Sequence, residues 1–207
     1  FQTRLRALRS GGPDRLRVIT DFDQTLTTFM GSDGRRGDEC HGVLLAHLDP
    51  HSVPGLEASD WMHLKEIERL YCKGDRAGMD AYVQPLNVGD DLVEWWFRTY
   101  QRCGAEFRLW EHADPCLARS NVQLREGLAA TFAWLEAHSI PLLVVSAGLR
   151  QILLRILEGH ACPLPPSAAL VTNDMRDSTP TVTESTKGSA LRLVPESHVA
   201  ATRGRTC

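Results

Sequence analysis

Residues 142–145 read Leu-Leu-Val-Val, an unbroken apolar run that limits the choice of fold more than any other stretch. A strand with one face in water alternates apolar and polar residues, whereas a strand buried on both faces is apolar throughout. Pro141 precedes the run, and a Ser-Ala-Gly turn follows it. The run therefore predicts an inner strand of a parallel sheet, with helices packed against that sheet.

Two further segments have the β-branched, apolar composition of short strands, at residues 16–20 and 169–172. Apolar residues at helical spacing fill residues 120–138 and 149–157, between the predicted strands. Strand and helix therefore alternate along the chain. This alternation is typical of a doubly wound α/β fold.

The alternation is interrupted after the first strand. Helical spacing at residues 60–71 and 88–100 predicts an inserted helical module there. Beyond the third strand the chain is rich in Thr, Ser and Arg and poor in large apolar residues, which predicts disorder. The predicted α/β catalytic core comprises residues 1–31 and 119–175. The predicted helical cap is formed by residues 32–118, and residues 176–207 form a divergent, disordered tail.

Composition excludes several classes of function. The formal net charge of the 207 residues is -3, and no basic stripe alternates with aromatics, so we expect no nucleic-acid partner. No apolar run approaches the roughly 20 residues of a membrane span, so we expect no membrane partner. The six cysteines include no CxxC pair, which favours free thiols in a reducing compartment and predicts a cytoplasmic protein.

The first predicted strand runs directly into Asp21-Phe22-Asp23-Gln24-Thr25, a D-x-D-x-T pattern. In an open α/β sheet, ligands bind beyond the carboxyl ends of the strands. Two carboxylates this close repel each other unless a divalent cation lies between them or one holds a proton. Mg²⁺ suits a site formed by these two carboxylates, because it prefers oxygen ligands. Asp21 can then attack phosphorus and Asp23 can act as acid and base; the plainer alternative is a turn or helix cap.

A second strand end carries Ser146-Ala147-Gly148. A hydroxyl, the following N–H groups and a helix N-terminus together suit a phosphate or oxyanion. Lys187 is a candidate cation for the transferring phosphate, and a solvent-exposed loop lysine is an equal interpretation. Asp174, after the third strand, is a weak candidate for a further metal ligand.

Several segments resemble the cytosolic type-III 5′-nucleotidases of the haloacid dehalogenase superfamily, which act on pyrimidine or 7-methylguanosine monophosphates. The similarity covers roughly residues 5–30 and 90–175. Its most specific motifs are at residues 7–29, 93–96 (Val-Glu-Trp-Trp), 124–127 (Leu-Arg-Glu-Gly), 138–148 and 171–175.

The resemblance implies a Rossmann-like haloacid dehalogenase core with an inserted α-helical cap, and Mg²⁺-dependent hydrolysis of nucleoside 5′-monophosphates through an aspartyl-phosphate. Asp21 would match the nucleophile and Asp23 the acid/base, and both would bind Mg²⁺. The expected substrate-binding residues are Thr25, Thr99, Ser146, Ala147, Gly148 and Lys187.

Two departures from the family pattern affect these expectations. The stretch in which the family's cap carries a base-reading glutamate is residues 78–85 here, with only Asp80 nearby. The family's Gly-Asp-Ser-x-Gly-Asp segment is absent, so we interpret the chain as C-terminally truncated and expect impaired turnover. The alternatives are a non-catalytic nucleotide- or partner-binding remnant, and a related phosphatase acting on another phosphomonoester.

Overall fold

The computed structural model describes residues 6, 10–12, 16–86, 92–177 and 182. Three parallel strands form a sheet in the order β1-β2-β3. They span Val18–Thr20, Leu142–Leu149 and Ala169–Asn173. Thr20 is paired with Val144, and Val145 with Val171, so the carboxyl ends of all three strands lie at one edge of the sheet.

Strand β2 is buried along its whole length, as the apolar run predicts. Leu142 and Val144 belong to the main apolar cluster, whereas Leu143 and Val145 belong to a second cluster with residues of β3. Successive side chains of a strand point to opposite faces. Both faces of β2 are therefore covered by apolar side chains.

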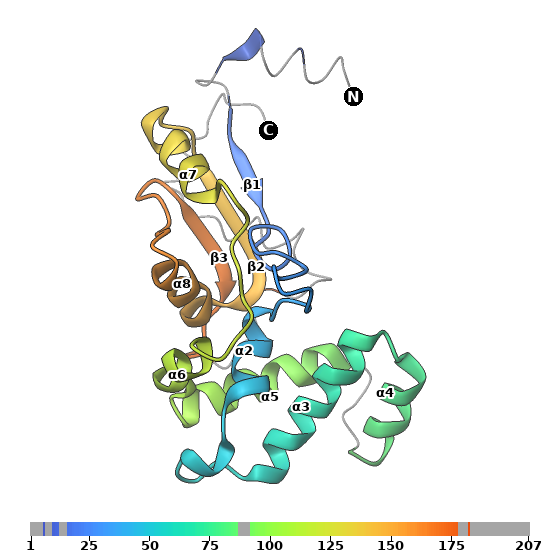
Figure 1. Cartoon of the computed structure of the whole chain (residues 1–207). Coiled ribbons are helices and arrows are strands. Elements are labelled where there is room, and N and C mark those ends of the chain that lie inside the picture. The colour runs from blue at the N-terminus through green and yellow to red at the C-terminus, as the bar shows by residue number, and fades with distance from the viewer. Residues whose placement is uncertain (1–5, 7–9, 13–15, 87–91, 178–181, 183–207) are drawn as a thin grey trace.

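Two helices connect to the strands, α7 (Leu128–Ala137) before β2 and α8 (Arg150–Gly159) before β3. Both lie on the same side of the sheet (Figure 1). The buried residues Ile152, Leu153 and Ile156 of α8 recur at helical spacing and pack into the main cluster. This face of α8 fixes the helix against the sheet directly after β2 ends at Leu149.

The helices between β1 and α7 lie beyond the carboxyl ends of the strands (Figure 1). They fall within the predicted cap, residues 32–118, whose status as a separate domain stays a prediction. The α-helices are α2 (Cys40–His47), α3 (Ala58–Lys73), α4 (Arg76–Val83), α5 (Leu92–Glu106) and α6 (Ala113–Leu117). Short 3-10 helices span Pro50–Ser52, Gln84–Leu86 and Leu109–His112.

The predicted helix at residues 120–138 is wrong in its first part, because α7 begins only at Leu128. Residues 120–127 instead pair with the segment that follows β1. Leu124 forms a bridge with Thr27, and Gly127 takes a left-handed conformation with φ of 78°. Tertiary contacts thus override the helical spacing of the apolar residues in this stretch.

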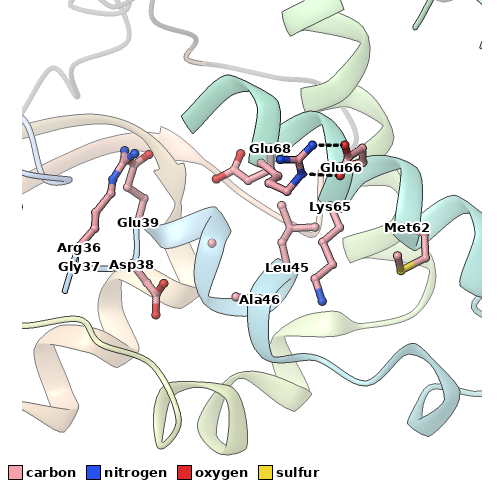
Figure 2. A pocket seen from close by; sticks show the side chains of 12 residues that line it. Arg36, Gly37, Asp38, Glu39, Leu45, Ala46, Met62, Lys65, Glu66 and Glu68 are labelled. Atoms are coloured by element: carbon pink, nitrogen blue, oxygen red, sulfur yellow. Dashed lines mark hydrogen bonds and ion pairs between the residues drawn. The ribbon is translucent and has the colours of Figure 1, made fainter. Parts of the chain in front are cut away.

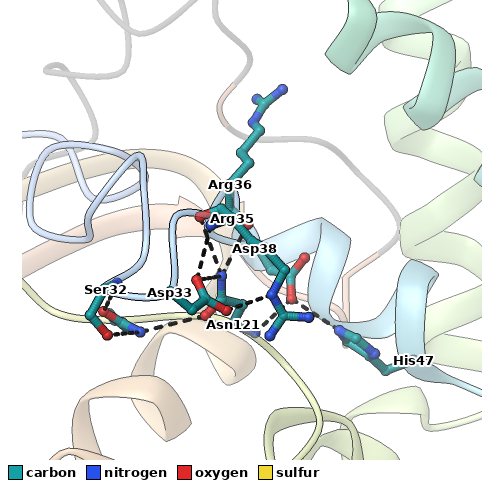
Figure 3. A network of polar contacts seen from close by, with 8 residues as sticks. Ser32, Asp33, Arg35, Arg36, Asp38, His47 and Asn121 are labelled. Carbon is teal, nitrogen blue, oxygen red and sulfur yellow. Dashed lines mark hydrogen bonds and ion pairs between the residues drawn. The ribbon is translucent and has the colours of Figure 1, made fainter.

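The segments that enter and leave the helical insertion are tied together by a polar network (Figure 3). The Asn121 main-chain N–H donates to Asp38 Oδ2 at 2.9 Å, and the same oxygen is 2.9 Å from His47 Nε2. The Ser32 N–H donates to Gln123 Oε1 at 3.0 Å. These contacts hold the segment that enters the insertion beside the segment that leaves it.

Of the predicted tail, the structure describes only residues 176, 177 and 182. Val182 is fully buried, and its N–H and carbonyl both pair with the Asn173 side chain. In the described part of the chain, no helix has both the length and the apolar character needed to span a membrane.

Candidate active site

The turn after β1 presents the two aspartates of the D-x-D-x-T pattern. Phe22, between them, is fully buried, and its carbonyl accepts hydrogen bonds from the N–H groups of residues 25–27. Asp21 Oδ1 accepts from the Phe22 N–H at 2.8 Å. Because the side chain between them is anchored in the core, Asp21 and Asp23 are both held at the end of β1.

Asp23 lies where β1, α2 and β2 meet. Its Oδ1 accepts a hydrogen bond of 2.9 Å from the Cys40 N–H at the start of α2. Its Oδ2 is 3.1 Å from the position that a β-carbon on Gly148 would occupy. Burial raises the pKa of Asp23, and His41 and the Cys40 N–H partly oppose the rise. The aspartate motif and the Ser-Ala-Gly segment are thus adjacent.

Ser146, Ala147 and Gly148 lie within β2 rather than in a turn after it, and the strand continues to Leu149. The pairing with β3 is irregular between Val145 and Leu149. The buried Ser146 Oγ accepts from the Gly148 N–H at 3.0 Å. In this conformation one of the N–H groups expected to bind phosphate is therefore satisfied within the segment itself.

The other predicted substrate-binding residues differ in their placement. Thr25 is exposed, and its carbonyl accepts from Arg125 Nε at 2.7 Å. Thr99 is half-buried in α5, next to Tyr100, which packs against His41. Lys187 lies outside the described residues.

Asp174, the weak candidate for a further metal ligand, is occupied by other partners. Its carboxylate pairs with Arg176, at 3.0 Å from Nε and 2.7 Å from Nη2, and accepts from the Gln151 amide. Hydrogen bonds from Arg176 hold its pKa well below the usual range for Asp. Asp174 therefore forms a structural ion pair with Arg176, and in this conformation its carboxylate is not available to a metal ion.

Sequence reasoning missed three residues that support this region. His41 Nε2 is 3.2 Å from the Ala147 carbonyl, and Asn173 Nδ2 donates to the same carbonyl at 2.7 Å. Thr27 is buried, and its Oγ1 accepts from the Gln24 N–H at 2.8 Å. Each makes a contact between distant segments or inside a turn, so hydrophobic periodicity carries no signal for it. The one signal in the sequence was the polar Asn173 directly after the predicted third strand, because a polar residue that is buried there needs a hydrogen-bond partner.

His41 also joins α2 to α5. Its ring lies 5.2 Å from the rings of Trp96 and Phe97, and the Tyr100 hydroxyl donates to its carbonyl at 2.9 Å. Trp96 is buried and donates through Nε1 to the Leu64 carbonyl at 3.1 Å. Trp96 is thus a core residue of the helical insertion.

Among the described residues, one group of three ionisable side chains is close enough to hold a metal ion: Glu39, His41 and Glu68. Their ligand atoms all lie within 4.8 Å of one another. Glu39 and Glu68 also line a pocket of about 470 Å³ between α2 and α3 (Figure 2). Asp21 and Asp23 are not part of this group.

Comparisons with known proteins identify the family of this chain. Residues 24–194 match the family described as pyrimidine 5′-nucleotidase (UMPH-1). The chain belongs to this family. The resemblance to the type-III 5′-nucleotidases is therefore confirmed at the level of the family.

Two relatives of this UMPH-1 chain carry the name 7-methylguanosine phosphate-specific 5′-nucleotidase. The one from Homo sapiens is 32% identical over 152 residues, covering 73% of this chain and 47% of its own length. The one from Gallus gallus is 29% identical over 175 residues, covering 83% and 55%. The chain thus spans about half the length of the curated relatives it matches.

A solved structure has the same fold as this family member. It is cytosolic 5′-nucleotidase IIIB (cN-IIIB) bound to cytidine, with a TM-score of 0.52 and 22% identity. The alignment covers 82% of this chain and 52% of the other. The predicted α/β class with a parallel sheet is therefore confirmed.

Proposed function

We propose that this UMPH-1 family chain binds nucleoside 5′-monophosphates and carries the machinery that hydrolyses them to nucleoside and phosphate. The observation that supports this most directly is the contact between Asp23 and Gly148. It brings the end of β1, with its two carboxylates, against the segment of β2 expected to bind phosphate. A phosphomonoester bound there would meet a nucleophile and an acid from the same turn.

In the proposed reaction, a carboxylate oxygen of Asp21 attacks phosphorus and the bond from phosphorus to the leaving oxygen breaks. Asp23 gives its proton to that leaving oxygen, so the nucleoside departs neutral. A water oxygen then attacks phosphorus while Asp23 takes a proton from that water. The bond between phosphorus and the Asp21 oxygen breaks, so phosphate leaves and Asp21 is a carboxylate again. The raised pKa of Asp23 supports this role, because an acid must still hold its proton when the substrate arrives.

Mg²⁺ is the proposed cofactor. Asp21 and Asp23 supply oxygen donors at one strand end, which suits a hard cation. The carboxylate of Asp21 and the main-chain carbonyl of Asp23 would hold the ion, which when bound offsets the negative charge of the phosphate. In the described residues no third carboxylate joins these two, and Asp174 is paired with Arg176.

This incomplete oxygen shell favours a second candidate function, nucleotide binding without efficient turnover. Losing a metal carboxylate weakens both metal binding and the positioning that catalysis requires. We therefore expect the 207-residue chain to bind nucleotide more clearly than it hydrolyses it.

Phosphate release from CMP, UMP and 7-methyl-GMP in the presence of Mg²⁺ tests the proposal. We expect slow release that Asp21→Asn lowers by at least about a thousandfold, as expected for loss of a nucleophile. Asp33→Asn, an exposed aspartate in the loop after β1, is the matched control and should leave release unchanged. Release that survives Asp21→Asn would contradict the assigned nucleophile.

Calorimetric titration of CMP and 7-methyl-GMP, with and without Mg²⁺, separates the two functions. Binding that requires Mg²⁺, without release, supports a non-catalytic nucleotide-binding chain. The absence of binding to either nucleotide would count against both functions. The two nucleotides cover the base types named in the family and in its relatives, pyrimidine and 7-methylguanosine.

We also propose a cytosolic location. It is supported by the name of a Caenorhabditis elegans relative, putative cytosolic 5′-nucleotidase 3, which is 22% identical over 170 residues. Cys40, Cys103, Cys116 and Cys162 are free and buried, as expected of a protein kept in reducing conditions.

A further inference from the structure

We propose that Glu39, His41 and Glu68 form a second cation site, which takes a divalent d-block cation such as Zn²⁺ or Co²⁺. The site lies between the start of α2 and helix α3. Its ligand atoms come from residues nearly thirty positions apart and still lie within 4.8 Å of one another. The inference rests on these three side chains and does not depend on the hydrolysis proposed for Asp21 and Asp23.

The imidazole of His41 is oriented by a main-chain carbonyl. Its Nε2 lies 3.2 Å from the Ala147 carbonyl, which can only accept, so Nε2 carries a proton. Nδ1 is then the nitrogen left to bind a metal, and within the described part of the chain it has no hydrogen-bond partner. A ring nitrogen fixed by a carbonyl on the opposite side is the usual arrangement of a metal-binding histidine.

The position of His41 is also rigid. The residue is only 8% exposed. Trp96 and Phe97 contact its ring edge to face, each at a centroid distance of 5.2 Å. The ring therefore cannot turn toward solvent without opening the aromatic core of the insertion.

Glu39 has one oxygen available. Its Oε1 accepts from Arg36 at 2.7 Å and from the Gln24 amide, whereas no hydrogen bond to Oε2 is present among the described residues. Glu39 is also the N-cap residue of α2, yet its side chain makes no capping hydrogen bond. The carboxylate is therefore not used to cap the helix.

Glu68 brings a second carboxylate from α3. Its Oε1 lies 3.9 Å from the position that a β-carbon on Gly42 would take, so it faces the first turn of α2. Both glutamates are only partly exposed, and carboxylates this close in a partly buried site repel each other. A divalent cation between them relieves that repulsion.

The ligand chemistry selects the class of metal. One imidazole nitrogen and two carboxylates suit Zn²⁺, Co²⁺ or Mn²⁺, whereas Mg²⁺ prefers oxygen ligands alone. The pocket that Glu39 and Glu68 line gives an ion a route from solvent and leaves room for a water as a further ligand (Figure 2). A bound ion would connect α3 to α2 and so restrain the helical insertion.

Titration of the purified chain with Co²⁺, in a large excess of Mg²⁺ and a non-thiol reductant, tests the site. The Mg²⁺ occupies oxygen-only sites, and the absorption spectrum of Co²⁺ distinguishes nitrogen and oxygen ligands from thiolates. We expect one equivalent bound through nitrogen and oxygen, and a higher melting temperature with metal. Glu68→Gln should weaken binding by about tenfold or more and abolish the thermal shift.

Glu66→Gln is the matched control. Glu66 lies on the same helix and lines the same pocket, but it is paired with Arg69 (Figure 2). This variant should bind Co²⁺ like the parent chain. His41→Asn should also lose binding, and its circular dichroism without metal checks that the fold is intact.

Three results would overturn the site: no Co²⁺ binding, thiolate bands in the spectrum, or equal affinity in Glu68→Gln and the parent. Because none of these readouts involves phosphate release, they leave the proposed hydrolysis unaffected. Conversely, a chain without turnover can still bind the metal.

Discussion

The carboxyl groups of Asp23 and Asp174 have opposite environments, and their pKa values move in opposite directions. Burial raises the pKa of Asp23, whereas hydrogen bonds from Arg176 lower that of Asp174. A raised pKa suits proton donation, and a lowered one indicates a carboxylate committed to a partner. The difference separates the candidate catalytic acid from a structural aspartate.

The ion pair of Asp174 makes a pH-dependent contribution to stability. Because the folded pKa is lowered, this contribution is complete above the unfolded Asp pKa of about 3.9 and is lost as the pH falls through the folded value. We expect Asp174→Asn to cost about 1 kcal/mol near neutral pH, since the Arg176 side chain is largely exposed. Urea unfolding at about pH 7 and at about pH 3 should show a smaller difference at the lower pH.

Asp80→Asn is the control for this measurement, because Asp80 is exposed in α4. Its unfolding free energy should match that of the parent at both pH values. A cost of Asp174→Asn that stays constant, or grows as the pH falls, would contradict the assigned ion pair.

The sequence allows the prediction of residues whose role is local. Asp21 and Asp23 were predicted because an apolar strand followed by D-x-D-x-T is a contiguous pattern. His41 was not, because its role depends on Ala147 and Trp96, which approach it only in the folded chain. Long-range contacts of this kind leave no periodic signal.

Among the elements, β1, α2 and β2 pack closely against one another at the candidate site. A β-carbon on Gly148 would lie 2.9 Å from Cys40 Sγ and 3.1 Å from Asp23 Oδ2. We expect Gly148→Ala to destabilise the chain by about 1–3 kcal/mol, because the added methyl group must push α2 away from β2. Thermal and urea unfolding measure the loss.

Gly159→Ala is the matched control for this substitution. A β-carbon there meets nothing within 4 Å, and Gly159 is the last residue of α8. Alanine favours the helix, so this variant should be neutral or slightly stabilised. Equal effects of the two substitutions would show that the junction is not tightly packed.

The strands were easier to predict than the helix boundaries. The unbroken apolar run of β2 reflects burial on both faces, and the structure confirms it. The predicted start of α7 was wrong because the polar groups of residues 120–127 find partners outside a helix. For example, the Arg125 N–H donates to the Leu26 carbonyl at 2.9 Å. Arg125 Nε and Nη2 also bond to the carbonyls of Thr25 and Gln24. The spacing of apolar residues cannot reveal such partners.

Across the whole molecule, a single apolar cluster joins the helical insertion to the sheet. It includes Trp61 and Tyr100 from α3 and α5, Leu44 from α2, and Val144 and Ile152 from β2 and α8. The alternation of strands and helices predicted the class of fold, which the family assignment and the likeness to cN-IIIB confirm. The shared cluster could not be predicted, because it depends on how the insertion packs.

We expect this shared cluster to make the insertion and the sheet unfold in one cooperative transition. Trp61, Trp95, Trp96 and Trp110 all lie in the insertion, so in a Trp134→Phe variant the tryptophan fluorescence reports on the insertion alone. Val144→Ala, at the centre of the sheet, should lower stability by about 2 kcal/mol. Its urea midpoints measured by fluorescence and by circular dichroism should shift together.

The exposed surface of the sheet supplies the control for that experiment. Ile19 in β1 is 47% exposed, so Ile19→Val should move both midpoints much less than Val144→Ala. If Val144→Ala shifted the midpoint measured by circular dichroism and left the fluorescence midpoint in place, the insertion would unfold independently. In that case the contacts of α2 and His41 would join two separately stable units, and closure of the insertion over the candidate site would cost little in stability.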